Sequence, residues 1–263
     1  MIQKTEFTKL HCGGNDFVLL DAKSLPQGTA LAELARRICR RKVSVGADGL
    51  LAILPSRSSD VAVTYLNQDG SPAQFCGNGL LSVARWVSAR EKRRTSVRIE
   101  WGGRTHEVWV SGDLLRGELP PPQDFRLDLL LQSGEIIDYV VIGVPHAVRF
   151  DPELEEMDVS QAGRKIRFDP LLAPDGANVD FCRQVDRHTL RLRTYERGVE
   201  AETFSCGSGA AAAVYVAYNR GMVEETVEAV ASGGRLTVHI EDGTRIFLEG
   251  QPRIVYRASI EEL

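Results

Sequence analysis

The second half of this chain repeats residues of its first half at a constant offset of 130 positions. In the first half, VAVTY is followed by a polar loop and Cys-Gly-Asn-Gly; in the second, RLRTY is followed by a polar loop and Cys-Gly-Ser-Gly. The identical residues are Thr64, Tyr65, Cys76, Gly77 and Gly79 in one copy and Thr194, Tyr195, Cys206, Gly207 and Gly209 in the other. Because this period is close to half of the 263 residues, it predicts two copies of one structural unit.

Each copy predicts a short strand, a loop and a helix that is buried on all sides. The segments GLLSVARWV and GAAAAVYVAYN are apolar nearly all the way round, which is typical of helices inside a domain. Short alternating or β-branched segments surround them, namely residues 2–9, 17–21, 96–101, 105–111, 138–143, 178–182, 226–231, 235–240, 244–249 and 252–257. The pattern predicts an α+β fold of two pseudo-symmetric domains, each an antiparallel sheet or barrel curled around a central buried helix.

Three consecutive prolines, Pro120, Pro121 and Pro122, mark the expected join between the two domains. Proline can neither donate a hydrogen bond to a sheet nor continue a helix, so regular structure is expected to stop there. The predicted domains are residues 1–119 and residues 120–250.

Charge and cysteine usage favour a small-molecule partner and a cytoplasmic location. The 32 basic and 36 acidic residues are spread along the chain, so they build no one-signed surface for nucleic acid or membrane. No signal-peptide pattern is visible, and the apolar stretches 139–144 and 210–217 are far shorter than the ~18 residues of a membrane span. The five cysteines form no CxxC pair and no cluster with histidine, which argues against a metal site and favours a reducing compartment.

Cys76 and Cys206 each stand directly before a helix that opens with Gly-x-Gly. At such a position, unpaired backbone amides and the helix dipole are expected to stabilise a thiolate, so that a pKa of ~8.5 falls to between ~3.5 and ~7.5. Glycines without side chains also let a ligand carboxylate approach those amides. A basic thiolate beside a bound carboxylate suggests removal of the proton α to that carboxylate.

Two such cysteines related by approximate two-fold symmetry predict a racemase. One thiolate takes the α-proton from one face of a flat intermediate, and the other thiol returns a proton to the opposite face. Pyridoxal phosphate, the usual electron sink for this reaction, needs a Schiff-base lysine. None of the lysines lies in a glycine-rich loop suited to phosphate, so no cofactor is expected; they are Lys4, Lys9, Lys23, Lys42, Lys92 and Lys165.

These motifs resemble those of the diaminopimelate epimerase family, and the resemblance covers the whole chain. The matching segments are LHCGGNDFVLLD (10–21), VGADGLL (45–51), LNQDGSPAQFCGNG (66–79), GVPHAV (143–148), ANVDF (177–181) and YERGVEAETFSCGSG (195–209). The resemblance implies a cofactor-independent enzyme that interconverts LL- and meso-2,6-diaminopimelate in lysine and peptidoglycan precursor biosynthesis. It also implies two similar domains, with a last strand, about residues 251–263, that returns to the first domain. The sequence leaves a homodimer open.

By motif, the resemblance also implies roles for particular residues. Cys76 and Cys206 match the catalytic pair. Helix-start groups that hold the α-carboxylate and α-amine are matched by Gly77, Asn78, Gly207 and Ser208, and further substrate contacts by Asn15, Asn67, Asn178 and Arg197. Glu196 and His146 match positions that orient the amine or assist a thiol. Asp16 and Asp48, which stand beside glycines, are interpreted as turn-formers.

The chain departs from the family pattern at four places, and one of them, Val144, keeps a second substrate class open. Val144 stands where the family usually has an asparagine that contacts substrate, and Leu80, Leu81 and Ser82 replace a common x-Arg-Cys. Cys12 and Asp180 replace a common apolar or glycine residue and a frequent asparagine, respectively. A cofactor-independent racemase of another amino acid, such as histidine, is therefore the alternative.

Two other classes are weaker alternatives. A binding protein or different isomerase on the same scaffold would not need both cysteines. A cysteine hydrolase that pairs one thiol with His146 leaves the second, symmetric cysteine unexplained.

Overall fold

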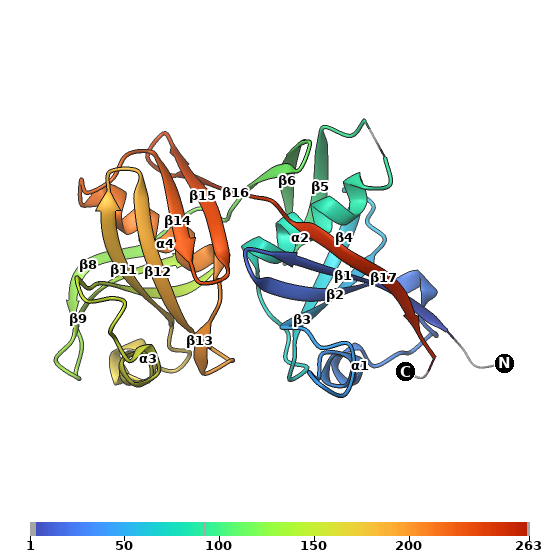
Figure 1. The fold of residues 1–263 in the computed structure, drawn as a ribbon, viewed down its shortest axis with the longest axis horizontal. Coiled ribbons are helices and arrows are strands. Elements are labelled where there is room, and N and C mark those ends of the chain that lie inside the picture. Colours follow the sequence, from blue (N-terminus) through green and yellow to red (C-terminus); the bar gives the residue numbers. More distant parts are fainter. Residues whose placement is uncertain (1–3, 92, 262–263) are drawn as a thin grey trace. The chain divides into compact units, whose positions relative to one another are not determined.

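The computed structural model describes residues 4–91 and 93–261, so residues 2 and 3 of the first expected strand and residues 262–263 of the last lie outside it. The chain divides into two compact units. Unit 1 consists of Met1–Gly117 together with Gln251–Leu263, and unit 2 consists of Glu118–Gly250. Figure 1 shows a long helix, α2 or α4, among the strands of each unit.

The described strands of unit 1 follow one another in the spatial order β17-β1-β2-β3-β4-β5-β6-β7. They are β1 (Thr5–Cys12), β2 (Asn15–Asp21), β3 (Gly49–Leu54), β4 (Val61–Asn67), β5 (Ser96–Trp101), β6 (Arg104–Ser111), β7 (Leu114–Glu118) and β17 (Arg253–Ile260). The helices are α1 (Leu31–Ile38) and α2 (Gly77–Ser88), with a short 3-10 turn, η1, at Ala22–Ser24.

Unit 2 has the spatial order β8-β9-β10-β11-β12-β14-β15-β16, with β13 also paired to β12. Its strands are β8 (Gln123–Leu130), β9 (Ile136–Ile142), β10 (Val144–Phe150), β11 (Asn178–Asp186), β12 (Thr189–Glu196), β13 (Ala201–Thr203), β14 (Thr226–Ala231), β15 (Gly234–Glu241) and β16 (Arg245–Gly250). The helices are α3 (Val159–Arg167) and α4 (Gly207–Asn219), with a 3-10 turn, η2, at Pro170–Leu172.

The strand pairing in each unit is mixed, which corrects the expectation of an antiparallel sheet. In unit 1, β2 pairs with β3 and β4 with β5 in parallel; in unit 2, β10 pairs with β11 and β12 with β14 in parallel. Between the members of every parallel pair the chain forms a helix, α1, α2, α3 or α4 respectively. A crossover of this length is what brings a chain back in the same direction, whereas a tight hairpin cannot. The α+β class itself is confirmed.

The strands β8 and β17 are related by the same offset of 130 residues as the sequence repeat. Strand β17 begins and ends 130 residues after β8, and the two pair antiparallel with β1 and β9 respectively. The C-terminal strand therefore occupies in the sheet of unit 1 the place that β8 occupies in unit 2.

The two cysteine-capped helices are the most buried elements of their units. Every residue of α2 from Gly77 to Ala84 is buried, and so is every residue of α4 from Gly207 to Ala217. The sequence prediction of all-round burial is confirmed for both. In α4 the four successive alanines 210–213 are small enough to let the surrounding strands pack closely.

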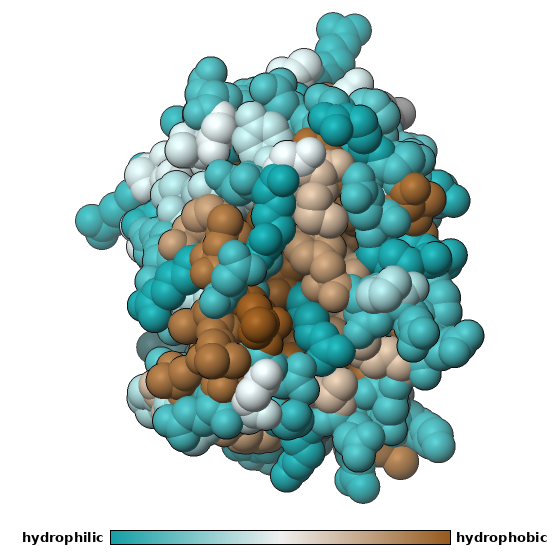
Figure 2. Space-filling view, turned by 90° about the vertical axis from the view of Figure 1, so that its left-hand side faces the viewer, coloured by the Kyte–Doolittle hydropathy of each residue, from teal (hydrophilic) through white to brown (hydrophobic). Residues whose placement is uncertain are grey.

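Strands β8 and β9 carry exposed apolar side chains on the surface of unit 2. Figure 2 shows apolar residues gathered on this side of the molecule. The exposed large apolar residues of the two strands are Leu127, Leu130 and Ile136. Among the helices that the structure describes, none combines the length and apolarity needed to cross a bilayer.

Candidate active site

Cys76 and Cys206 are the N-cap residues of α2 and α4. Each has an extended backbone, and each Sγ accepts a hydrogen bond from the amide three residues later, at 3.3 Å for Gly79 and 3.4 Å for Gly209. The expectation that both cysteines stand at helix starts is confirmed. Both residues are partly accessible, whereas Cys12, Cys39 and Cys182 are buried.

The second glycine of each Cys-Gly-x-Gly motif is required by close packing. A Cβ on Gly79 would lie 3.0 Å from the Trp101 ring, and a Cβ on Gly209 would lie 2.2 Å from Asp180 Oδ1. At the second distance a carboxylate or the helix has to move. The glycines therefore let neighbouring side chains reach the first turn of each helix, beside the thiol.

In unit 1, the side chain of Asn15, one of the predicted site residues, contacts Cys76. The Cys76 thiol donates to Asn15 Oδ1 at a distance of 3.6 Å. Gly77 and Asn78 form the first turn of α2 and are buried. Asn67 lies at the end of β4, where its Nδ2 donates to Ser71 Oγ at 3.0 Å and so braces its own turn.

Cys12 lies near Cys76 but is not a second nucleophile there. Complete burial raises the pKa of Cys12 to about 12, and the negative charge that Cys76 carries once it is a thiolate adds to this rise. A thiol in this state is an inert packing group at neutral pH. The departure from the family pattern at Cys12 is therefore a change of packing.

In unit 2, the surroundings of Cys206 raise the pKa of its thiol well above the usual value. Burial is the largest cause, followed by the negative charges of Glu196 and Asp180, while Ser208 and the Gly209 amide act in the opposite direction. The Ser208 hydroxyl lies 3.6 Å from Cys206 Sγ. The expectation of a lowered thiol pKa is thus wrong for Cys206 in the free chain, because tertiary neighbours outweigh the helix start.

A buried polar cluster lies against the start of α4. His146 Nδ1 lies 2.7 Å from Asp180 Oδ2, and Thr194 donates to Asp180 Oδ1 at 2.8 Å. The side chains of His146 and Asp180 are completely buried. Asp180 therefore contacts His146 and lies beside Gly209. Its negative charge is also one of the causes that raise the pKa of Cys206. In the sequence, Asp180 is only a departure from the family pattern, and the available signal was an acid beside apolar residues in ANVDF.

Asn178 and Arg197 are brought together at the adjoining ends of β11 and β12. Asn178 Oδ1 accepts a hydrogen bond from the Arg197 backbone amide at 2.8 Å. The Arg197 guanidinium is half-buried, and burial together with nearby Arg167 lowers its pKa. Within the described part of the chain it forms no ion pair. A partly desolvated cation of this kind attracts a carboxylate.

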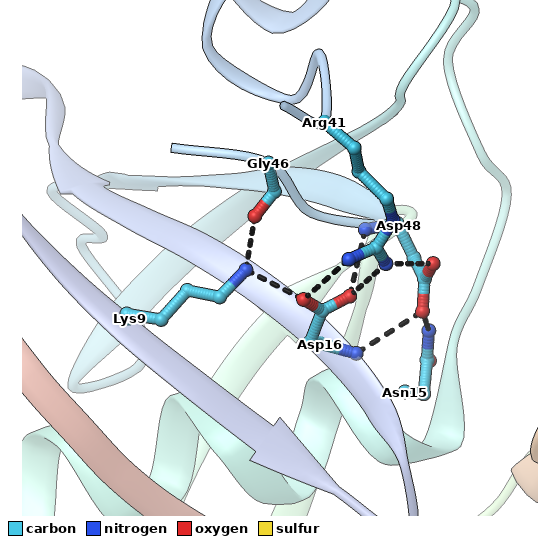
Figure 3. A network of polar contacts seen from close by, with 6 residues as sticks. All are labelled: Lys9, Asn15, Asp16, Arg41, Gly46 and Asp48. Atoms are coloured by element: carbon cyan, nitrogen blue, oxygen red, sulfur yellow. Dashed lines mark hydrogen bonds and ion pairs between the residues drawn. The ribbon is translucent and has the colours of Figure 1, made fainter. Parts of the chain in front are cut away.

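Asp16 and Asp48 belong to a charged network with Lys9 and Arg41 (Figure 3). Their interpretation as turn-formers was incomplete, since each carboxylate also accepts the other residue's backbone amide at 3.1 Å. Nothing in the local sequence showed that Arg41, in the same loop as Asp48, would also reach Asp16 in β2.

The predicted residues form two groups, one in each unit. Unit 1 gathers Asn15, Cys76, Gly77 and Asn78; unit 2 gathers Cys206 with Gly207, Ser208 and Glu196, and Asn178 with Arg197, while His146 reaches this region through Asp180. Across residues 4–91 and 93–261, no three His, Cys, Asp or Glu side chains cluster as a metal site would require.

Comparison with known proteins places the chain in a family. The family model described as diaminopimelate epimerase matches residues 7–114 and 139–255. A diaminopimelate epimerase of Methanothrix thermoacetophila is 36% identical, covering 99% of this chain and 98% of that protein. One from Aquifex aeolicus is also 36% identical, covering 98% of each.

Solved structures of lower sequence identity share the fold. A hydroxyproline epimerase from Agrobacterium vitis superposes with a TM-score of 0.73 at 16% identity, covering 98% of this chain and 91% of that one. A phenazine biosynthesis protein of the PhzF family from Bacillus anthracis has a TM-score of 0.73 at 14% identity, covering 98% and 99%. The whole-length sequence matches confirm the resemblance found in the motifs, and the chain belongs to the diaminopimelate epimerase family.

Proposed function

We propose that this chain is a cofactor-independent isomerase that interconverts LL- and meso-2,6-diaminopimelate. The observation that carries the proposal is the pair of partly accessible cysteines, each capping a buried helix in one copy of a duplicated unit. Relatives that are 36% identical over nearly the whole chain bear the name diaminopimelate epimerase, which supplies the substrate. The reaction belongs to lysine and peptidoglycan precursor biosynthesis, and we expect it to take place in the cytoplasm.

In the proposed mechanism, the two thiols act on opposite faces of the α-carbon. One cysteine, as thiolate, removes the α-proton, and the other, as thiol, donates a proton to the opposite face; the roles exchange in the reverse direction. The first amides of α2 and α4, at Gly77, Asn78, Gly207 and Ser208, bind the α-carboxylate and the negative charge that develops on it. Donors fixed in advance at a helix start stabilise such charge without reorganising during the reaction.

Substrate binding itself is proposed to activate Cys206. The charge of Glu196 is one of the causes that raise the pKa of the Cys206 thiol. An α-ammonium group paired with Glu196 cancels that charge, so the Cys206 pKa falls when substrate is present. The thiolate is thereby formed where a proton is to be removed, and the free enzyme avoids a permanently reactive thiolate.

The carboxylates of the substrate fit the cation of Arg197. Its guanidinium is half-buried and without an ion pair among the described residues, and its backbone is held by Asn178. A planar guanidinium can bind a carboxylate through two parallel hydrogen bonds. Asn15 and Asn67 are proposed to complete the contacts from unit 1.

A racemase of another amino acid is the second candidate, and Val144 favours it. This residue is buried at the start of β10 and has no side-chain group for a polar ligand. The test is to incubate the purified chain with LL-diaminopimelate and, in parallel, with single enantiomers of histidine and other amino acids, and to separate stereoisomers by chiral chromatography. Formation of meso-diaminopimelate alone supports the proposal. Racemisation of another amino acid without turnover of diaminopimelate would overturn the substrate and leave the two-thiol reaction in place.

A further inference from the structure

The orientation of the Asn15 side chain is fixed by a carboxylate. Asn15 Nδ2 donates to Asp48 Oδ2 at 2.7 Å. A carboxylate accepts hydrogen bonds only, so the amide nitrogen has to face Asp48 and the amide oxygen has to face the other way. That oxygen is the atom 3.6 Å from Cys76 Sγ. Figure 3 shows the Asn15 side chain directed at Asp48.

Asp48 is in turn held on both oxygens. Its Oδ1 accepts from Arg41 Nη2 at 2.8 Å, and its Oδ2, besides Asn15, accepts the backbone amide of Asp16 at 3.1 Å. The backbone amide of Asp48 also donates to the backbone carbonyl of Asp16 at 3.0 Å. The carboxylate therefore cannot rotate away from Asn15 without breaking several bonds.

A second carboxylate completes the anchor (Figure 3). Asp16 Oδ1 accepts from Arg41 Nη2 at 2.6 Å, and Asp16 Oδ2 accepts from Lys9 Nζ at 2.6 Å. The Lys9 ammonium is largely buried and also donates to the Gly46 carbonyl. Two cations and two carboxylates thus form a balanced network, which a partly buried site can hold at low electrostatic cost.

We propose that Asp48, anchored by Arg41 and Asp16, is a positioning residue that locks the Asn15 amide and thereby holds Cys76 as a thiol. The oxygen that Asn15 presents accepts a hydrogen bond from S–H but has no proton to offer a thiolate. A flipped amide would present NH₂ and favour the thiolate instead. The lock thus favours the protonated state of Cys76 in the free chain, which is the state that donates a proton when Cys206 is the base. This assignment rests on the proposed function, whereas the locked amide itself does not.

Alkylation of Cys76 tests the lock independently of catalysis. In a Cys206→Ser chain, Cys76 is the remaining partly accessible cysteine, since the other three are buried. The rate of its reaction with iodoacetamide, followed by peptide mass spectrometry, is proportional to its thiolate fraction and so gives a pH midpoint. Asp48→Asn leaves the Asn15 amide free to flip. The midpoint is expected to move to lower pH, with the alkylation rate at pH 7 rising about tenfold for a shift of ~1 unit.

Asp16→Asn is the matched control, because it removes the same charge from the same network and leaves the bond between Asn15 and Asp48 in place. A much smaller shift is expected from it. Equal midpoint shifts in Asp48→Asn and Asp16→Asn would mean that only the loss of a negative charge affects the Cys76 thiol. That result would overturn the proposal. In an Asn15→Leu background, Asp48→Asn should add no shift, and an undiminished shift there would also overturn it.

One measurement needs no change in the network. Hydrogen exchange of the Asn15 side-chain amide in the unmodified chain, followed by NMR, should be slower than that of exposed asparagine side chains. Free exchange at Asn15 overturns the lock even if Asp48→Asn fails to fold. Asp48→Asn can also shift the Cys76 midpoint as expected while the unmodified chain does not act on diaminopimelate. That combination would reject the proposed function and keep the lock.

Discussion

Asn15 and Asp48 are joined by a 2.7 Å hydrogen bond that has no counterpart in unit 2. Strand β2 begins at Asn15 and pairs in parallel with β3, with Phe17 opposite Gly49. Strand β10 begins at Val144 and pairs in parallel with β11, with His146 opposite Asn178. By this register, Val144 corresponds to Asn15 and Ala177 to Asp48. One copy of the unit therefore has an amide and a carboxylate at these two places, beside Cys76, and the other copy has apolar residues at both.

Asp180→Asn is expected to lower the pKa of the Cys206 thiol. Burial is the main reason that this pKa is raised and persists in the variant, but the charge of Asp180 also raises it and is removed. The thiolate fraction at a given pH therefore increases, and the midpoint of Cys206 alkylation in a Cys76→Ser chain should move to lower pH.

Asp186→Asn is the matched control for this shift. Asp186 is an exposed acid at the end of the same strand, β11, and caps the His188 amide. Its replacement should leave the Cys206 midpoint in place. If Asp180→Asn leaves the Cys206 midpoint of the Cys76→Ser chain unchanged, the result contradicts the electrostatic role of Asp180.

Arg197→Lys is expected to weaken substrate binding more than it slows the chemical step. Lysine keeps the charge but loses the planar pair of donors, and charge-assisted bonds of this kind contribute about 1.5–3 kcal/mol. KM should rise about tenfold or more, with a smaller change in kcat, in steady-state kinetics. Arg191→Lys, at an exposed residue of β12 that pairs with Glu155, serves as the control. A loss confined to kcat would argue against carboxylate binding by Arg197.

Gly209→Ala should destabilise the chain more than Gly79→Ala. The added methyl group would lie 2.2 Å from a buried carboxylate oxygen in the first variant and 3.0 Å from an aromatic ring in the second. Overpacking of this kind costs about 1–3 kcal/mol. Thermal unfolding followed by circular dichroism gives the order, and the reverse order of melting temperatures would show that Asp180 moves aside easily.

Acid should weaken the contribution of Asp16 to stability. Burial alone would raise the pKa of Asp16, but hydrogen bonds from Arg41 and Lys9 outweigh it and hold the pKa below its usual value. An acid whose pKa is lowered by folding contributes its full stabilisation at pH values above its pKa in the unfolded chain, ~3.9. This stabilisation is lost as the pH falls through the pKa of the folded state. The melting temperature of Asp16→Asn should lie below that of the unmodified chain at pH 7, with a gap that narrows below about pH 4. A gap that stays constant across this range is the contrary result.

The sequence predicted those features that short segments encode. The Cys-Gly-x-Gly starts of α2 and α4 and the all-round burial of both helices depend on neighbouring residues, and both were foreseen. The parallel pairs β2–β3 and β10–β11 were missed because their direction depends on the crossovers through α1 and α3, whose apolar faces are short. Strands β3, β7, β8, β10 and β13 were missed for the same lack of a clear local pattern.

Site electrostatics depended on residues that are distant in the chain. The pKa of Cys206 is raised in part by Asp180, 26 positions earlier, which no local rule for helix starts includes. The lock on Asn15 comes from Asp48 and Arg41, which belong to another loop. The role of the residues at the helix starts could therefore be predicted from the sequence. The protonation state of the thiols could be predicted only once the folded structure was known.

The most direct test of the two-thiol reaction is proton NMR of LL- and meso-diaminopimelate in deuterated water with the unmodified chain, Cys76→Ser and Cys206→Ser. The unmodified chain should interconvert the isomers and replace the α-proton by deuterium. Each variant should lose interconversion by at least ~10²-fold, because serine cannot replace the missing acid or base. Any exchange that remains should favour opposite isomers in the two variants. Interconversion that persists in either variant would contradict a mechanism in which both cysteines transfer the proton.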